Sequence, residues 1–240
     1  MKRKEVFSGI RAAPPVIMRM DGRNFKESLA RLGFLRPYDI AFARGMVSAA
    51  RSLLADSGLA PAWAFTFSDE ISVLFEELPF DGRVEKLDSV VPSYMSSALT
   101  LSLKQPSPLA FDARVIPVHR EEIIDYLINR QSEAWRNHMQ SHGFYTLVSE
   151  GMGEREAATK MKGMKFEDIH EMMWQRGVNL NETPGWQRKG VFIYRKPYEK
   201  EGLNPLTGKV VLVDRTEIVE DWDPPVFGSD EGKAFLRSIL

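Results

Sequence analysis

Residues 16–25 read "VIMRMDGRNF", an apolar run that ends in an acid and is followed at once by a glycine. The run that begins at Pro15 predicts a short β-strand, and the Asp-Gly pair predicts the turn that ends it. Asp21 then has two interpretations, a common turn residue or a metal ligand at the mouth of a sheet. The stretch alone favours the turn, so the decision rests on the elements around it.

The segments that follow alternate in type. Apolar residues at spacings of three and four predict a helix over 37–58, and aromatic and β-branched residues predict a two-stranded hairpin over 62–76. A second helix is expected over 83–103, kinked or delayed in its start by Pro92, and a further strand over 113–118. The order β-α-β-β-α-β predicts an α+β fold with the ferredoxin-like arrangement, in which the first and third strands are central neighbours.

The second half of the chain has a different pattern. A long helical stretch over 119–148 is followed by two shorter helices, and two strand-like runs are separated by an expected hairpin loop over 197–208. That hairpin either extends the sheet or stands alone. The tail over 221–235 is expected to be turn-rich and in part mobile. We therefore expect a palm-like catalytic core over 1–119 and, packed on it as one unit, a helical extension with a C-terminal β-hairpin over 120–240.

Composition excludes several classes of protein. The 240 residues contain no cysteine, which excludes disulfides and cysteine-ligated zinc. No apolar run approaches the roughly 20 residues of a membrane span, and no signal-peptide pattern follows the basic N-terminus, so a soluble cytoplasmic protein is expected. With 32 basic and 33 acidic side chains, a non-specific nucleic-acid coat is not expected. A nucleic-acid enzyme with its basic residues gathered on one face is compatible with this balance, and the overall charge does not decide between the classes.

Two acids become important together in this topology. Asp21 follows the first strand and Asp69 lies in the "FSDE" hairpin, so neighbouring central strands would bring two mutually repelling carboxylates close. Mg²⁺ prefers such hard oxygen ligands, and two ions about 4 Å apart activate a hydroxyl and neutralise a leaving pyrophosphate. Gly22, which lacks a β-carbon, would let its carbonyl approach a metal. The alternative is that Asp69 is a turn residue and Glu70 is solvated; the topology favours the metal.

Candidates for phosphate binding surround the same place. Backbone amides of residues 23–26 can form an anion-binding concavity, and Arg36 stands before a helix N-terminus. Asp39 has the commoner interpretation of an N-terminal helix charge. Arg83 and Lys86 would share one helix face. Each of these residues, taken singly, is more often a solvated surface residue.

Five stretches, "VIMRMDGRNF", "FTFSDEISVLF", "FDARVI", "NRQSEAWRNH" and "RKGVFIYR", occur in the order found in the tRNA-histidine guanylyltransferase family. The resemblance spans roughly residues 5–196. The family includes archaeal and bacterial relatives described as guanylyltransferase-like 3′-to-5′ polymerases. It implies a polymerase-type palm and a transferase for tRNA processing that binds GTP, ATP and magnesium. Such an enzyme adds a nucleotide to the tRNA 5′ end: ATP activates the 5′ phosphate, or a triphosphate is already present. The 3′-hydroxyl of GTP then attacks, and AMP or pyrophosphate leaves. The resemblance also implies a homotetramer.

Residue by residue, the resemblance implies that Asp21 and Asp69 hold two magnesium ions, that Gly22 gives a carbonyl, and that Glu70 belongs to the same catalytic motif. The positions implied for the nucleoside triphosphate are Arg23, Asn24, Phe25, Lys26, Arg36, Asp39 and Ser68. The positions implied for tRNA or the activating nucleotide are Arg83, Lys86, Arg130, Asn137, Arg188 and Lys189.

The chain departs from the family pattern at three places. Eukaryotic members carry "HINN" where residues 135–138 read "WRNH"; Lys26 stands where histidine is expected, and Arg36 where lysine is expected. The positive charges survive, so nucleotide binding should survive. The "WRNH" form resembles archaeal or bacterial members, which leaves strict tRNA-histidine selection and repair of 5′-truncated tRNAs both open. A nucleotide cyclase on the same palm and a non-catalytic tRNA-binding protein are the alternative functions.

Three side chains of the long helical stretch have competing interpretations. His138 and His142 have the i, i+4 spacing of a zinc pair, but no third ligand is evident nearby, and surface or tRNA-facing residues are favoured. Trp135 is either a base-stacking platform or, more commonly, a buried tryptophan.

Overall fold

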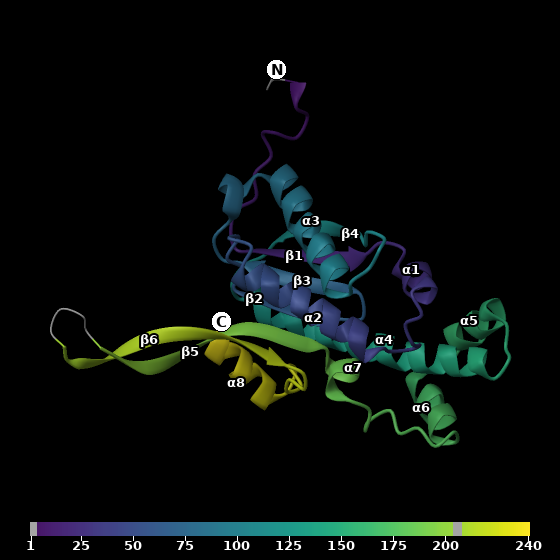
Figure 1. Ribbon diagram of the computed structural model, residues 1–240. Helices are drawn as coiled ribbons and strands as arrows, with labels where there is room; N and C mark the ends of the chain where they lie inside the picture. Colours follow the sequence, from purple (N-terminus) through teal and green to yellow (C-terminus); the bar gives the residue numbers. More distant parts are fainter. Residues whose placement is uncertain (1–3, 204–207) are drawn as a thin grey trace.

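A six-stranded antiparallel sheet organises the chain in the computed structural model, which describes residues 4–203 and 208–240 (Figure 1). The strands lie in the order β4-β1-β3-β2-β5-β6. Their bounds are β1 Val16–Gly22, β2 Trp63–Phe67, β3 Glu70–Phe75, β4 Phe111–Pro117, β5 Val191–Leu203 and β6 Val210–Asp221. The first four strands have the ferredoxin-like order with β1 and β3 as central neighbours, so the predicted fold class is confirmed.

Helices cover both faces of this sheet (Figure 1). The helices are α1 Phe25–Arg31, α2 Ile40–Ala55, α3 Val84–Ser102, α4 Glu122–Ser149, α5 Glu154–Lys162, α6 Phe166–Trp174, α7 Gly185–Lys189 and α8 Asp230–Ile239, with a 3-10 turn η2 Pro79–Gly82. Helices α2 and α3 pack on one face, and the first half of α4 packs with α8 on the other. None of the helices within the described ranges combines the length and the apolar character that a membrane crossing requires.

Strand β1 shows how the pleat separates the two faces. Val16, Met18 and Met20 are fully buried in the cluster under α2 and α3, whereas Ile17 is buried in the cluster under α4. Side chains of a strand alternate between faces, so Asp21 shares the face of Ile17. Burial of each large apolar side chain stabilises the fold by roughly 1.5–3 kcal/mol. The central strand is therefore a rigid support for Asp21.

Helix α1 is the first element that the sequence pattern missed. The turn expected after Asp21 is present at Arg23 and Asn24, but it leads directly into a helix that begins at Phe25. The Phe25 ring lies 6.1 Å from the Phe42 ring and 5.2 Å from the Phe111 ring, measured between centroids. The helix has only seven residues, of which Phe25 and Leu29 are buried, so the segment is too short to show a helical repeat in its apolar residues. Tertiary packing stabilises this helix instead.

The C-terminal tail was predicted wrongly in its last part, because residues 222–229 are turn-rich as expected but a helix follows them. Residues 230–239 form α8, which Ser229 caps by accepting a hydrogen bond from the amide of Gly232. Phe227 and Leu236 are fully buried against the sheet. The proline-rich and glycine-rich composition before Ser229 suggested turns throughout, yet the two large apolar residues anchor the tail.

The last two strands settle one open alternative, because Val191–Tyr194 pairs with β2 and the hairpin therefore extends the sheet. Strands β5 and β6 pair from Phe192↔Asp221 to Leu203↔Val210 and project beyond the other strands (Figure 1). The predicted loop over 197–208 was too long, since its first part is strand; residues 204–207 lie outside the described ranges. Helix α3 begins at Val84 and continues through Pro92, so its start is not delayed.

Candidate functional site

The ends of β1 and of the β2–β3 turn meet at one point of the sheet. The amide of Gly22 donates a hydrogen bond to the carbonyl oxygen of Asp69 at 3.1 Å. In the strand register, Asp21 lies directly opposite Glu70 on β3 and opposite Asp112 on β4. The two acids that the sequence singled out are therefore neighbours, with two further carboxylates beside them.

This concentration of negative charge changes the protonation of the acids. Burial is the largest cause that raises the pKa of Asp21, and the neighbouring Asp112 raises it further. Burial also raises the pKa of Asp69, with a further increase from Asp21. The negative charges of two close carboxylates repel each other, and a cation bound between them removes this repulsion. Such a pair therefore binds a cation favourably.

Glu70 differs from these acids because it has a partner. The Arg130 guanidinium of α4 donates to both Glu70 carboxylate oxygens at 3.2 Å, and the two side chains are only 17% and 18% exposed. Burial nevertheless raises the pKa of Glu70 against the opposing effect of Arg130. The Glu70 carboxylate is thus mostly buried, and the charge of Arg130 balances its own. The interpretation of Glu70 as a solvated residue is wrong.

The donor set fits magnesium better than a more fully ligated metal. Within residues 4–203 and 208–240, no three histidine or acidic side chains converge to form a complete ligand group. Mg²⁺ needs only one or two protein carboxylates, because it keeps several waters and binds substrate phosphates. Asp21 and Asp69 supply hard oxygens whose mutual repulsion a divalent cation would remove.

A cavity of about 230 Å³ adjoins Asp69. It lies between α1, α2, the β2–β3 turn and the second half of α4, and its lining divides by chemistry. The apolar part includes Phe25, Leu29, Phe34, Phe42 and Met46. The polar part includes Lys26, Arg36, Asp39, Ser68, Asp69, Asn137 and Ser141. Aromatic walls together with two cations and acids in the polar part suit a ligand that has a flat apolar ring at one end and phosphates at the other.

Lys26 and Arg36 connect this cavity to the helices around it. The Arg36 guanidinium donates to the Lys26 carbonyl oxygen at 2.6 Å, and the Lys26 ammonium donates to Glu154 of α5 at 2.7 Å. The same cations lie over aromatic rings of α4, Lys26 at 5.5 Å from the Phe144 centroid and Arg36 at 5.6 Å from that of Tyr145. Both charges that replace the family's expected residues therefore line the cavity.

The predicted concavity of backbone amides is only partly available. The amide of Gly22 is committed to Asp69, and that of Arg23 donates to the carbonyl oxygen of Ala110 at 2.8 Å. Asn24 has a positive φ of 58°, and its side-chain amide donates to Glu27. The amide of Arg23 is thus not free for an anion, and a nucleotide contact of the Arg23 or Asn24 side chain stays a prediction.

Asp39 has the helix role that the sequence analysis weighed as the commoner one. Its carboxylate accepts hydrogen bonds from the amides of Leu35 at 2.9 Å and Ala41 at 2.7 Å, at the N-cap of α2. Burial acts to raise its pKa, but these hydrogen bonds and one from Phe42 outweigh burial and lower it. Asp39 shapes one wall of the cavity through this cap.

The candidates for tRNA contact are dispersed. Arg83 lies at the N-terminus of α3, paired with Glu85 at 3.7 Å, and Lys86 follows one turn later, beyond the end of β3 remote from Asp21. In α7, Arg188 donates to the Thr183 carbonyl oxygen, and Lys189 pairs with Asp223 at 2.7 Å. Arg130 and Asn137, by contrast, lie beside the acids and in the cavity wall.

The two histidines of α4 contact each other, and they differ in burial. His138 is fully buried, so the expectation of a surface or tRNA-facing residue is wrong for it. Its Nε2 lies 3.1 Å from the Thr183 hydroxyl, and its ring centroid lies 4.6 Å from that of His142. Trp135, half-buried, stacks on the His138 ring with centroids 5.5 Å apart, which makes it a packing residue. No third ligand joins the pair among the residues described, so zinc is not supported.

Some residues of the site were missed by sequence reasoning. Asp112 belongs to the quoted "FDARVI" stretch but was not singled out. Its position opposite Asp21 follows only from the register in which β1 pairs with β4. Tyr145 and Trp186 line the cavity, and no local signal distinguishes them from core residues.

The sheet has the ferredoxin-like order, and two carboxylates lie at the ends of its central strands beside a cavity with an aromatic part and a cationic part. These features define a palm-type nucleotidyltransferase. Two family models match the chain, one after the other. The model described as "tRNAHis guanylyltransferase" matches residues 1–119, and that described as "Thg1 C terminal domain" matches residues 121–220. The chain belongs to the tRNAHis guanylyltransferase family. The division into a core over 1–119 and an extension over 120–240 stays a prediction.

Individual relatives agree with this assignment. A probable tRNA(His) guanylyltransferase of Drosophila melanogaster is 31% identical over 192 residues, which cover 75% of this chain and 67% of that protein. The tRNA(His) guanylyltransferase of Debaryomyces hansenii is 30% identical over 202 residues, covering 78% and 76%.

Solved structures share the fold. A bacterial tRNA(His) guanylyltransferase (Thg1)-like protein in complex with ATP matches with a TM-score of 0.78 and 22% identity, over 100% of this chain and 96% of that one. The tRNA(His) guanylyltransferase of Saccharomyces cerevisiae matches with a TM-score of 0.71 and 23% identity, over 80% and 90%.

Proposed function

We propose that this chain is a magnesium-dependent nucleotidyltransferase that extends the 5′ end of tRNA in the 3′-to-5′ direction. Family membership and the names of the relatives support the substrate, and structures of a bacterial family member with ATP and with GTP support the nucleotides. The observation that carries the proposal is the junction of β1 with the β2–β3 turn. This junction joins the end of the strand that carries Asp21 to Asp69, which lines the cavity.

The reaction has two displacements at phosphorus. The tRNA 5′ phosphate first attacks the α-phosphorus of ATP and releases pyrophosphate, unless the end already carries a triphosphate. The 3′-hydroxyl of the incoming GTP then attacks the activated 5′ phosphorus and loses its proton, and AMP or pyrophosphate leaves. Two Mg²⁺ ions, when bound, would acidify the hydroxyl and neutralise the leaving group.

The residues of the chain have separable roles in this proposal. Asp21 and Asp69 would hold the two ions, with the Gly22 carbonyl as a further oxygen ligand. Lys26 and Arg36 would face the triphosphate of the nucleotide whose base enters the aromatic part of the cavity. Asn137 would contact the nucleotide or the tRNA end from α4. Contacts of Arg83, Lys86, Arg188 and Lys189 with tRNA, a homotetrameric assembly and a cytoplasmic location complete the proposal.

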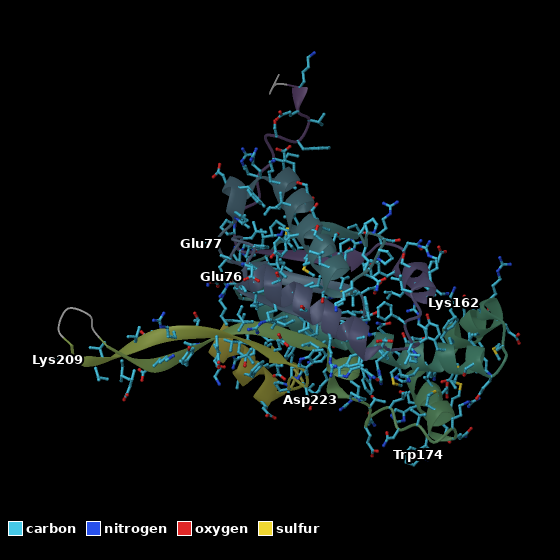
Figure 2. The ribbon with its side chains drawn as sticks, in the orientation of Figure 1. Glu76, Glu77, Lys162, Trp174, Lys209 and Asp223 are labelled. Carbon is cyan, nitrogen blue, oxygen red and sulfur yellow. The ribbon has the colours of Figure 1, made fainter. Side chains whose placement is uncertain are left out.

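The decisive experiment incubates the purified protein with Mg²⁺, each nucleoside triphosphate in turn, and 5′-labelled full-length or 5′-truncated tRNAs. Asp21→Ala and Asp69→Ala should abolish extension while circular dichroism shows a folded chain. Glu77→Ala is the matched control, since Glu77 is exposed and lies at the far side of the sheet from α5 and α6 (Figure 2). With ATP present to activate 5′-monophosphate ends, extension of full-length tRNA by GTP and by no other nucleotide indicates guanylyl addition. Extension of truncated tRNA by the nucleotide complementary to the opposite strand indicates repair.

The same assay separates the alternative functions. Full activity in both aspartate variants would reject the proposal. A cyclic product from GTP and Mg²⁺ without RNA would indicate a cyclase, and tRNA binding with no turnover of any nucleotide would indicate a binding protein.

A further inference from the structure

A second groove lies on the outer side of α2, away from the acids. It measures about 480 Å³ and is lined by Ile40, Arg44, Val47, Ser48, Arg51, Glu220 and Trp222. Val47 also lines the nucleotide cavity, so the two spaces share a wall. The groove is not used by the reaction described above.

The basic residues of the groove form a stripe along α2. Arg44, Ser48 and Arg51 follow at spacings of four and three, which places them on one helix face, with about 10.5 Å of rise between the two arginines. Arg51 is held in place, because its guanidinium donates to the Ile218 carbonyl oxygen at 2.9 Å and lies 3.5 Å from Glu220. Arg44 is exposed and makes no hydrogen bond or ion pair with any part of the chain that the structure describes.

Trp222 supplies the apolar wall. It is half-buried, and it packs on the core through an edge contact with Trp186, with ring centroids 6.4 Å apart and planes at 80°. Ile40 beside it is 43% exposed. A tryptophan fixed by the core and still partly accessible, next to an exposed isoleucine, offers a surface on which an unpaired base can stack.

The charges of the groove indicate which class of molecule would bind there. Two arginines and one glutamate give this groove a formal charge of +1, although the whole chain carries −1. Guanidinium groups bind phosphate through paired hydrogen bonds, and aromatic faces bind bases, so the combination matches a nucleic-acid strand rather than an acidic peptide or an apolar helix.

We infer that this groove binds an RNA strand of the tRNA, with Arg44 on a backbone phosphate and an unpaired base against Trp222. The inference rests on the proposed function and deepens it, because it names where the RNA lies relative to the nucleotide cavity. Trp186 lines that cavity and contacts Trp222, so the strand would pass directly behind the cavity wall.

The first test uses Arg44→Ala in the full-length enzyme. The KM for tRNA should rise about 5- to 10-fold, and the dependence of log affinity on log salt should fall by about one unit, because one phosphate contact is lost. The KM for GTP and the melting temperature should not change, and Arg44→Lys should recover part of the loss. Arg237→Ala is the matched control, since Arg237 is an exposed arginine of α8, the helix that packs on the other face of the sheet.

The second test exploits the absence of cysteine. Ser48→Cys creates a single thiol in the groove, which can carry an azidophenacyl group for photo-cross-linking to 5′-labelled tRNA. The cross-link should map to one segment of the tRNA and disappear with excess unlabelled tRNA. The same label on Ser238→Cys, exposed on α8, should give no specific product.

The outcomes distinguish this inference from the proposed function. Nucleotide addition by the wild type, with an unchanged tRNA KM in Arg44→Ala and no specific cross-link from Ser48→Cys, would overturn the groove and leave the function standing. A changed oligomeric mass of Arg44→Ala with an unchanged tRNA KM would assign the groove to a second copy. A wild type that neither binds tRNA nor adds nucleotides would remove both.

Discussion

Gly22 and Asp69 are joined by a backbone hydrogen bond of 3.1 Å between two strand ends that lie 47 positions apart in the sequence. The bond closes the corner where β1 meets the β2–β3 turn. Since β1 and β3 are also paired along their length, Asp21 and Asp69 cannot move apart without breaking the centre of the sheet. The repulsion between these acids is therefore imposed by the fold, and three predictions concern the charges around them.

Asp69→Asn should stabilise the metal-free protein and abolish its response to magnesium. The substitution removes a carboxylate whose pKa is raised by burial and by Asp21, so the melting temperature should rise slightly in EDTA. In the wild type, Mg²⁺ at ten times its Kd should add about 1.4 kcal/mol to the free energy of unfolding. Calorimetry with EDTA and with Mg²⁺ measures both effects, with Glu77→Gln as control. An equal gain from Mg²⁺ in Asp69→Asn would contradict the metal assignment.

Lys26→Ala and Glu154→Ala form a matched pair, because they remove the two ends of one ion pair. Both side chains are about 60% exposed, so the pair itself is worth only about 0–1 kcal/mol and neither change should alter stability measurably. Lys26 lines the cavity, and its loss should raise the KM for GTP about 10-fold, as expected for one charge-assisted hydrogen bond. Glu154→Ala should leave this KM unchanged or lower it. Equal effects of both variants would show that the ion pair, and not the cation, is what the nucleotide requires.

Arg130→Met tests the compensation of Glu70. The arginine covers a carboxylate that is only 18% exposed, and its removal leaves a mostly buried charge without a partner. The free energy of unfolding should fall by about 1–3 kcal/mol at neutral pH. The double variant with Glu70→Gln should recover part of this loss in urea titrations. No recovery would show that Arg130 stabilises α4 by packing alone.

The sequence predicted the palm better than its surroundings, for a physical reason. The strands around Asp21 and Asp69 are buried and alternate regularly, so their period, order and pairing follow from composition and turn residues. The neighbourhood of Asp21 and Asp69 followed from that order. Partners that depend on packing between distant elements, such as Arg130 on Glu70 or Asp112 opposite Asp21, leave no local pattern.

The errors have a common cause. Helix α1 and the buried His138 were missed because a few long-range contacts override weak local preferences in short or mixed segments. The commitment of the Arg23 amide to Ala110 likewise depends on a loop far along the chain. The cavity lining could be predicted only where the family motifs reach it, as at Lys26 and Arg36.

His138 should make the fold sensitive to acid. Burial, followed by His142 and Arg188, lowers the pKa of His138 from 6.5 to about 3. Between these values the unfolded chain binds more protons than the folded one, so stability is complete above about pH 6.5 and is lost as the pH falls below it. The contribution at pH 5 is a loss of about 2 kcal/mol relative to neutral pH.

Urea titrations at about pH 5 and pH 7.5 measure this loss. In His138→Gln the difference between the two pH values should be smaller by about the same amount, whereas in His119→Gln, at an exposed position, it should not change. An identical pH dependence in wild type and His138→Gln would show that other groups control the acid response.

Phe227→Ala should destabilise the chain although it lies in the segment that the sequence analysis expected to be turn-rich and in part mobile. The Phe227 ring is fully buried, with centroids 5.6 Å from Phe65 of β2 and 5.7 Å from Phe192 of β5, and its amide donates to the Gln131 side chain of α4 at 2.7 Å. Truncation of a phenylalanine in such a core costs about 3–5 kcal/mol. Val226→Ala is the control, because that neighbour is 57% exposed and should cost less than about 0.5 kcal/mol. Chemical denaturation measures both values, and equal stability of the two variants would mean that the tail does not contribute to the folded core.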